Sequence, residues 1–537
     1  MDRLTLFDVN GDIGCSAYGE ADYPTATALV EQLDYLGIDR TLVSHAESRE
    51  LNPTWGNRRL LREIEASGHG DRLLPAFTVS PSCYFENGVL PFLKEKFSSG
   101  QVRAIRIYPE ICRYPVLHLE RILAELAVWR PAVLWNCPTF ANENDIRDFV
   151  TLAGKFPEMS FLFTQKMWPG FGSLIDALWR QKNIYVDISW VHMRDTVKLM
   201  IDDFGADRLV FGTGYKAHYG AAVAALAHYP ITPDQRELIG HGNIERLLRL
   251  PPLEKKLAVA PALLARKPLW QRCRNGLPLE GVPLIDAHAH AGPANRGWYV
   301  RQIDFPEIAH VMINQMDRLG VKKTVISAET ALFGNSLEGN LFAEKTLTPY
   351  PGRFAGYLVF NPRYKAEMVP AFDSFFQRGF FVGFKILAAY WKIPLTHPDY
   401  EAVWSYADHH RLPILVHTWD DSYNSPAMLK EIVRKYPHAN FLLGHSGGGT
   451  RGRLEAEELA VNNANVHLEF CGSFCTPRPF ETSMGLVGND RVIFGSDTGG
   501  HDQAWELGRY LSMPLPDDQL IPGLGRNFEK LEAQSTK

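Results

Sequence analysis

Residues LIDAHAHAG (284–292) and LFDVNGDIG (6–14) are two versions of one segment, and this likeness decides how the chain is organised. Two later pairs repeat at nearly the same spacing: FLFTQ (161–165) with FLLGH (441–445), and DRLVFGTG (207–214) with DRVIFGSD (490–497). Solenoid units recur every ~20–50 residues, which is far shorter than this spacing. The repeat therefore predicts the duplication of a whole domain.

The length of the chain agrees with two domains, because 537 residues exceed what one hydrophobic core usually organises. We expect residues 1–250 to form the first domain and residues 281–537 the second. The segment 251–280 contains PPLEKK and the basic stretch ARKPLWQRCR, and we interpret it as a linker.

Short apolar segments alternate with helical stretches in each half, which predicts βα units. About 250 residues with eight such units is the size of a (β/α)8 or TIM-type barrel, so we expect an α/β protein with two tandem barrels. A doubly wound open sheet is the alternative. The eight strand candidates of the second half are PLIDAHAH, KTVISAE, FAGYLVFNP, FVGFKIL, PILVHT, NFLLGHS, VHLEFCGS and RVIFGSD.

Composition is that of an ordinary globular protein, with 45% hydrophobic and 22% charged residues and a net charge of −5. No basic tract suggests nucleic acid, and no apolar run is long enough for a membrane span. The N-terminus lacks the pattern of a signal peptide, and the seven cysteines are scattered and odd in number. We therefore expect a cytoplasmic protein that binds neither nucleic acid nor membrane.

Histidine and aspartate stand at the ends of several strands in the second half. His288 and His290 are two residues apart and so leave one face of the first strand, His417 ends the fifth, His445 ends the sixth and Asp497 ends the eighth. Barrel enzymes place their chemistry at this C-terminal rim. Imidazoles and a carboxylate that meet there suit a divalent cation with an open coordination position.

These motifs resemble the amidohydrolase superfamily, in particular its second family, which includes small-molecule hydrolases and decarboxylases related to aminocarboxymuconate semialdehyde decarboxylase. DAHAH (286–290), PILVHT (413–418), LLGHSGGG (442–449) and IFGSD (493–497) carry the likeness, which spans about 280–535. The resemblance implies a catalytic metal. Its implied ligands are His288, His290, His417 and Asp497, with His445 as the acid or base that handles the water and Asp497 as a second proton carrier.

Lys385, in the fourth strand, should point into the barrel, because its neighbours Phe384 and Ile386 suit the outer face. In dinuclear amidohydrolases a carboxylated lysine on this strand bridges two metals, and we count Lys385 among the catalytic candidates. The first half carries Arg106 at this position, so a plain cation suffices there. We expect one metal ion, zinc, with manganese, iron or cobalt as alternatives.

The first half has lost the ligand set, since Asn10 and Asp12 replace the two histidines of the first strand. Gln165 replaces His445, and Gly214 replaces Asp497. We expect a degenerate barrel that acts as a non-catalytic pseudo-subunit. The chain would then be an internal pseudo-dimer, with further homo-oligomers left open.

The reaction remains open between two chemistries. We expect hydrolysis of a C–N or C–O bond in a small organic molecule by activated water, and the alternative is nonoxidative decarboxylation of an unsaturated or aromatic acid. A second alternative is a non-catalytic, metal-stabilised binding protein. The substrate is expected to contact Trp298, Tyr390, Trp419 and His501. If the reaction is decarboxylation, this substrate is a carboxylate.

Overall fold

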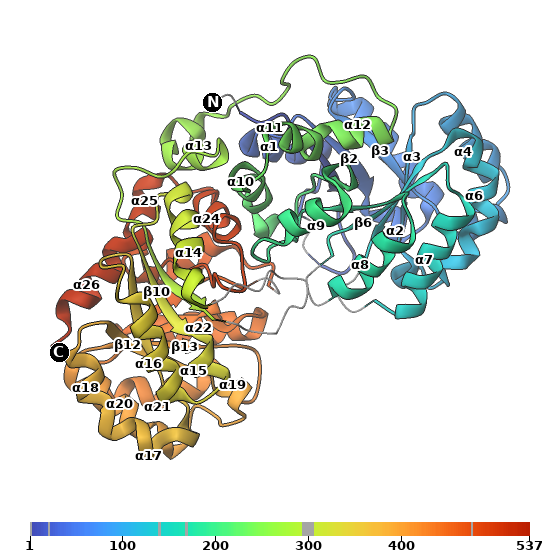
Figure 1. Cartoon of the computed structure of the whole chain (residues 1–537). Coiled ribbons are helices and arrows are strands. Elements are labelled where there is room, and N and C mark those ends of the chain that lie inside the picture. The colour runs from blue at the N-terminus through green and yellow to red at the C-terminus, as the bar shows by residue number, and fades with distance from the viewer. Residues whose placement is uncertain are drawn as a thin grey trace. The chain divides into compact units, whose positions relative to one another are not determined.

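The computed structural model describes residues 3–19, 22–137, 141–166, 170–292, 305–473 and 476–536. It divides into two compact units, each built on eight parallel strands in sequential order (Figure 1). Among the described residues, the first unit takes in 3–216 and 225–265, and the second takes in 217–224, 266–292 and 305–536. The prediction of two tandem (β/α)8 barrels is confirmed.

The first barrel consists of short strands with helices between them. Its strands are β1 (Phe7–Ile13), β2 (Arg40–His45), β3 (Leu73–Thr78), β4 (Ala104–Ile107), β5 (Ala132–Asn136), β6 (Ser160–Thr164), β7 (Ile184–Asp187) and β8 (Leu209–Val210). Its longer helices are α1 (Ala26–Leu36), α3 (Pro53–Ser67), α4 (Val89–Ser98), α7 (Glu143–Lys155), α8 (Phe171–Arg180) and α9 (Thr196–Phe204). Helix α10 (Ala221–His228) is divided, with residues 221–224 in the second unit and 225–228 in the first.

The second barrel repeats this order. Its strands are β9 (Ile285–Ala291), β10 (Lys323–Ala328), β11 (Phe354–Val359), β12 (Phe381–Ile386), β13 (Pro413–His417), β14 (Asn440–Gly444), β15 (Val466–Glu469) and β16 (Val492–Ile493). Its longer helices are α14 (Phe305–Leu319), α16 (Ser336–Leu347), α20 (Glu401–His410), α22 (Thr450–Asn462), α23 (Phe480–Val487), α24 (Gln503–Leu511) and α26 (Asn527–Gln534).

Backbone hydrogen bonds close the second barrel between its first and last strands. The Ala287 N–H donates to Phe494 O at 3.0 Å, the Asp497 N–H to His288 O at 2.7 Å, and the His290 N–H to Thr498 O at 2.6 Å. A doubly wound sheet would leave these two strands apart at its edges. Closure therefore excludes the open sheet and brings Asp497 beside the histidines of β9.

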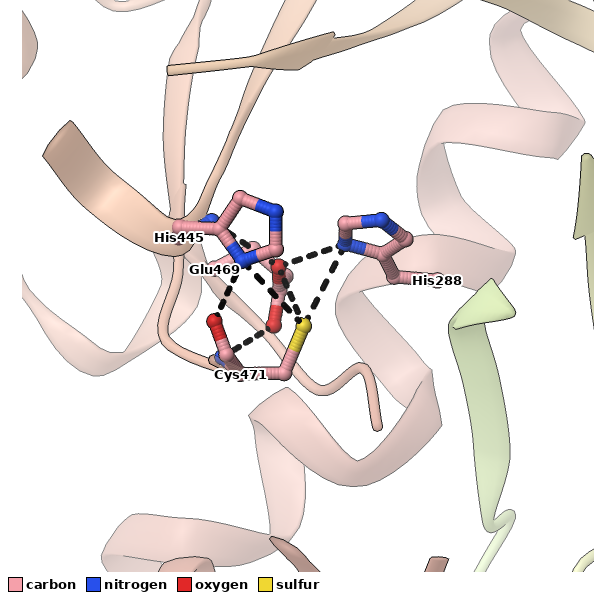
Figure 2. A group of neighbouring side chains, drawn as sticks. All are labelled: His288, His445, Glu469 and Cys471. Carbon is pink, nitrogen blue, oxygen red and sulfur yellow. Dashed lines mark hydrogen bonds and ion pairs between the residues drawn. The ribbon is translucent and has the colours of Figure 1, made fainter. Parts of the chain in front are cut away.

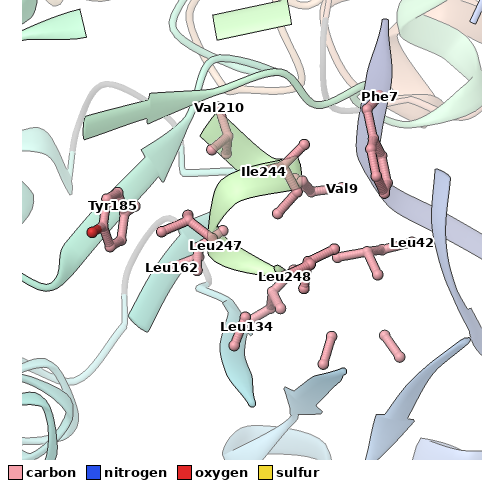
Figure 3. Close-up of a cluster of buried hydrophobic side chains, with 13 residues drawn as sticks. Phe7, Val9, Leu42, Leu134, Leu162, Tyr185, Val210, Ile244, Leu247 and Leu248 are labelled. Carbon is pink, nitrogen blue, oxygen red and sulfur yellow. The ribbon is translucent and has the colours of Figure 1, made fainter. Parts of the chain in front are cut away.

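Each barrel is filled by inward-facing side chains and closed at its base by a C-terminal helix. In the first barrel, Ile244, Leu247 and Leu248 at α12 (Asn243–Leu247) pack against strand residues such as Val9 and Leu134 (Figure 3). In the second, Phe528 and Leu531 of α26 join the cluster that includes Ile285, Tyr357 and Leu442. The interiors are packed cores, so polar chemistry is left to the C-terminal rims.

No helix among the described residues combines the length and the apolar character needed to cross a bilayer.

Candidate metal centre

The structure brings His288, His290 and Asp497 together at the C-terminal rim of the second barrel. His290 Nε2 lies 2.8 Å from Asp497 Oδ1, and His288 Nε2 lies 3.5 Å from the same oxygen. One nitrogen or oxygen of each residue lies within 4.8 Å of the others, as the ligands of one ion must. The described residues thus offer a place for a divalent cation.

Asp497 and His445 both hold backbone conformations that L-residues rarely adopt, with φ of 55° and 67°. Gln165, which replaces His445 in the first half, has φ of 53°. Such strain persists only where the surrounding structure enforces it, and it gathers at functional sites. The strand-end turn that presents His445 therefore has a counterpart in the first barrel, where Gln165 takes the place of the histidine.

A hydrogen bond links His417 to His445, with His417 Nδ1 2.9 Å from His445 Nε2. His445 Nδ1 lies 2.6 Å from the carbonyl oxygen of Cys471, which accepts only, so His445 carries its proton on Nδ1. In a neutral His445 ring, Nε2 must then accept from the His417 Nδ1–H. His417 is left with its lone pair on Nε2, the atom that a metal ligand needs.

The same pattern holds for the other two imidazoles. His288 Nδ1 lies 2.9 Å from a carboxylate oxygen of Glu469, and His290 Nδ1 lies 3.2 Å from the carbonyl oxygen of Ser327. Each ring therefore has an acceptor for an Nδ1–H, which is the usual arrangement of metal-binding histidines. His288 Nε2 accepts from Lys385 in the structure, whereas His290 Nε2 faces Asp497 Oδ1 and would bind a cation only after losing a proton. The donor set fits a divalent cation, and the ligand role of all four predicted residues remains a prediction.

Electrostatics favour the protonation states that ligands need. Burial, and then the charge of Lys385, hold the pKa of His288 well below its ordinary value. Burial and His445 do the same for the pKa of His417. Burial opposes ionisation of Asp497, but the imidazoles of His501 and His288 hold its pKa well below the usual range. His288 and His417 are therefore neutral, and Asp497 is ionised, at neutral pH.

Lys385 points into the barrel, as predicted, and its Nζ lies 2.8 Å from His288 Nε2. Burial lowers the pKa of Lys385 to about 8. Its ammonium group donates to the lone pair that His288 would offer to a cation, so a bound ion and Lys385 must share this space. A lowered pKa reduces the free-energy cost of neutralising Lys385 when a cation is present.

Aromatic side chains lie beside His417. Trp419 stacks on its ring, with centroids 6.2 Å apart and 13° between planes, and Tyr390 meets it edge-on at 5.6 Å. His501 Nδ1 lies 3.6 Å from Asp497 Oδ2. Three of the four predicted substrate contacts therefore lie around the centre, whereas Trp298 lies outside the described residues. Their contact with a substrate remains a prediction.

Two functional candidates were missed by sequence reasoning, Glu469 and Cys471. Figure 2 shows them with His288 and His445, and the four form a second group of closely spaced ligand atoms. Cys471 Sγ lies 3.1 Å from Glu469 Oε2 and 3.3 Å from His288 Nδ1. The scattered cysteines of the sequence carry no motif that singles out Cys471, whereas Glu469 has a signal: it is a carboxylate at the end of an apolar strand.

In the first barrel, the residues at the corresponding strand ends form a hydrogen-bond network around Asp187. Asn10 replaces His288 and donates its side-chain amide to Asp187, which ends β7 as Glu469 ends β15. The Gln165 N–H donates to Asp187 Oδ1 at 3.1 Å, as the His445 N–H donates to Glu469 Oε2 at 3.2 Å. Among the described residues, both groups of clustered ligand atoms lie in the second barrel.

Burial raises the pKa of Asp187 to about 7, which predicts a pH-dependent stability of the first barrel. An unfolded aspartate titrates near 3.9, so the folded state binds the extra proton between these values. The stabilisation is full below about pH 4 and is lost as the pH rises to about 7, by about 4 kcal/mol in total. Urea unfolding of wild type and Asp187→Asn from pH 4 to 8 tests this. The difference between their unfolding free energies should change across that window, and a constant difference contradicts it.

The amidohydrolase family model matches the chain over residues 122–250 and 285–534, which is more than half of its length. No curated protein matches the chain. Solved structures are similar at low identity. The 5-carboxyvanillate decarboxylase LigW of Sphingomonas paucimobilis is 14% identical with a TM-score of 0.37, covering 48% of this chain and 100% of its own.

Two further structures have similar values. A 5-carboxyvanillate decarboxylase of Novosphingobium aromaticivorans, complexed with manganese and a nitrobenzoic acid, is 14% identical (TM-score 0.38; 47% of this chain, 96% of its own). A 2,6-dihydroxybenzoate decarboxylase from Rhizobium is 13% identical (TM-score 0.36; 47% and 99%). The family match, which falls in both halves, is the finding that assigns the chain: it belongs to the amidohydrolase family and is a metal-dependent enzyme of hydrolase or decarboxylase type.

Proposed function

We propose that the second barrel hydrolyses a C–N or C–O bond of a small organic molecule with the help of one divalent cation. The observation that carries the proposal is the common orientation of three imidazoles. His288, His290 and His417 each have Nδ1 beside a hydrogen-bond acceptor, which reserves Nε2 as the ligand atom. The Asp497 carboxylate lies next to two of these rings.

A cation held by His288, His290, His417 and Asp497 would supply Lewis acidity to polarise a substrate oxygen and to acidify water. His445 is the base next to the ligand His417, with its Nδ1–H fixed on Cys471 O. Its Nε2 accepts from the His417 Nδ1–H in the structure, and it would receive a proton from water once that hydrogen bond is exchanged for one to the water. Burial lowers the pKa of His445, which keeps the ring neutral and able to accept a proton near pH 7. Trp419 and Tyr390 would exclude bulk water and orient the substrate.

Nonoxidative decarboxylation is the second candidate, and Lys385 is the observation that favours it. The reaction needs a cation beside the departing carboxylate, and Lys385 is a buried amine in contact with His288. Four arginines that follow strands of the second barrel already have other partners: Arg363 donates to Trp391 O, Arg451 lies beside Glu455, Arg453 donates to Ser446 O, and Arg478 donates to Glu457. Family membership as an enzyme leaves no support for the non-catalytic alternative.

Metal content is the first test. Protein purified without chelator should hold one equivalent of divalent metal per chain, because the four predicted ligands make one coordination site. We expect zinc. Inductively coupled plasma mass spectrometry measures both number and identity, and dialysis against EDTA should lower the melting temperature of the second barrel. Two equivalents would contradict the mononuclear assignment, and a metal-free protein unchanged by EDTA would contradict the proposed function.

Isotopes separate the two reactions. The enzyme is incubated with a panel of lactones, p-nitrophenyl esters and N-acyl amino acids in H₂¹⁸O, and with hydroxybenzoic acids in D₂O. Hydrolysis incorporates ¹⁸O into the product acid, whereas decarboxylation releases CO₂ and puts deuterium on carbon. Metal-dependent ¹⁸O incorporation supports the hydrolase, and deuterated product with CO₂ release would replace it by the second candidate.

A further inference from the structure

The Glu469 carboxylate accepts hydrogen bonds from His288, His445 and Cys471 (Figure 2). It ends β15 and is 1% exposed. Oε2 accepts from His288 Nδ1 at 2.9 Å, from the His445 N–H at 3.2 Å and from Cys471 Sγ at 3.1 Å, and Oε1 accepts from the Cys471 N–H at 2.6 Å. One carboxylate thus joins the ends of three barrel strands.

We infer that Glu469 is the positioning residue of the metal centre, an inference that rests on the proposed function. Its oxygens hold the His288 proton on Nδ1, so that Nε2 carries the lone pair on the side of His290 and Asp497. A carboxylate partner of this kind fixes the ring orientation of a metal-bound histidine and raises its basicity. Its carboxylate contacts the Nδ1 side of the His288 ring, opposite the nitrogen that would bind the cation.

Glu469 orients His445 as well. Its Oε1 holds the Cys471 N–H, and the carbonyl of Cys471 in turn accepts from His445 Nδ1 at 2.6 Å. The hydroxyl of Ser446 donates to Glu469 O, and the Glu469 N–H donates to Ser446 Oγ, which ties the β14 turn to β15. Ligand orientation and the orientation of the proton acceptor therefore depend on the same side chain.

Gly495 packs closely against both His288 and Glu469. A Cβ placed on Gly495 would lie 2.5 Å from His288 Cβ and 3.0 Å from Glu469 Oε1, so glycine is required where these two side chains meet. Four hydrogen bonds to the Glu469 carboxylate, from His288, the His445 N–H, the Cys471 thiol and the Cys471 N–H, account for the close packing of these side chains.

The first barrel supplies a matched comparison. Asp187 holds the place of Glu469 and accepts from the Asn10 side chain, the Gln165 N–H and the Ser189 hydroxyl. The first barrel therefore has a similar hydrogen-bond network around a buried carboxylate, but its described residues include no group of closely spaced ligand atoms. Substitution at Asp187 therefore perturbs a buried carboxylate of the same type without touching the centre.

The test is Glu469→Gln in the full-length protein. A glutamine keeps one acceptor but places an NH₂ group against a donor at whichever end it occupies, because both oxygens of Glu469 accept. Zinc affinity, measured by competition with a chromophoric chelator, should fall about 10- to 100-fold. The visible spectrum of the cobalt-substituted protein should shift, which a loss of stability alone would not cause.

Three variants accompany it. Asp187→Asn should leave zinc affinity and the cobalt spectrum unchanged, and Cys471→Ser, which keeps a donor to Oε2, should stay within a few-fold of wild type. If Glu469→Gln fails to fold, Glu469→Asp keeps the charge but withdraws it from His288, and it should weaken zinc binding in folded protein.

A folded Glu469 variant with wild-type zinc affinity and spectrum overturns the inference. So does a second metal equivalent that both Glu469→Gln and Cys471→Ser remove, because the four side chains would then be ligands themselves. Wild-type protein that binds no metal would instead sink the proposed function.

Discussion

Asparagine in place of His445 should lower turnover by about 10²- to 10⁴-fold while the metal content stays at the wild-type value. Asparagine tolerates the left-handed backbone at this position (φ 67°) and can still donate to the Cys471 carbonyl, so the turn should survive. It cannot accept a proton from water at neutral pH. Steady-state kinetics on a substrate found in the isotope panel, with metal analysis of the same sample, measures both quantities.

Gln165→Asn is the matched control, because Gln165 occupies the same kind of turn in the first barrel with φ of 53°. Its turnover should equal that of wild type. A His445→Asn enzyme that retains full activity would remove His445 from the proton transfer. Loss of metal together with activity would make His445 a ligand and contradict its assigned role.

A fragment of residues 280–537 should fail to fold into a soluble, metal-binding barrel. The second unit includes residues 217–224 and helix α13 (Pro268–Arg274), both of which the fragment lacks. Trp270 of α13 is fully buried, and the Leu269 N–H donates to Asp517 at 2.6 Å. Loss of one large buried aromatic costs about 3–5 kcal/mol, against a domain stability of about 5–15 kcal/mol.

Residues 217–224 add contacts that the fragment also loses. The Tyr219 hydroxyl donates to Glu481 at 2.6 Å and accepts from the Phe480 N–H at 3.0 Å. His218 packs edge-on against Trp505 of α24, with ring centroids 5.3 Å apart. Helix α24 follows the segment that carries Asp497 and His501. Without these residues, the support of that part of the rim is removed.

Solubility, circular dichroism and metal content of fragments 280–537 and 266–537 measure the effect. The longer fragment regains Trp270 but still lacks residues 217–224, so it should be more stable than the shorter one and less stable than the full chain. Trp270→Ala in the full chain should lower the melting temperature of the second unit. A soluble 280–537 fragment with full metal content and cooperative unfolding would contradict the prediction.

Most residues of the centre can be predicted from the sequence, because their positions follow from strand periodicity and strand ends. Side chains two residues apart on a strand share a face, which placed His288 with His290. Residues at the carboxyl ends of parallel strands meet at one rim, which placed Asp497 beside them. The repeat showed which half had kept this set, since Asn10 and Gly214 cannot replace His288 and Asp497 as ligands.

The hydrogen-bonding roles of Glu469 and Cys471 cannot be predicted in this way, because their partner His288 is distant in the sequence. Glu469 meets His288, 181 residues away, only once closure of the barrel has set β9 beside the segment after β16. The tautomers of His288, His417 and His445 likewise depend on acceptors that come from other strands or turns.

The duplication, the two βα barrels and the rim residues that can bind a cation can all be predicted from the sequence, because periodicity and strand-end position act over short stretches of chain. The fold is needed to show the hydrogen-bond partner of each imidazole, the buried carboxylate that holds His288, and the place of residues 217–224 in the second unit. Hydrogen-bond partners and buried contacts are set by the register and closure of the barrel, which no local pattern encodes.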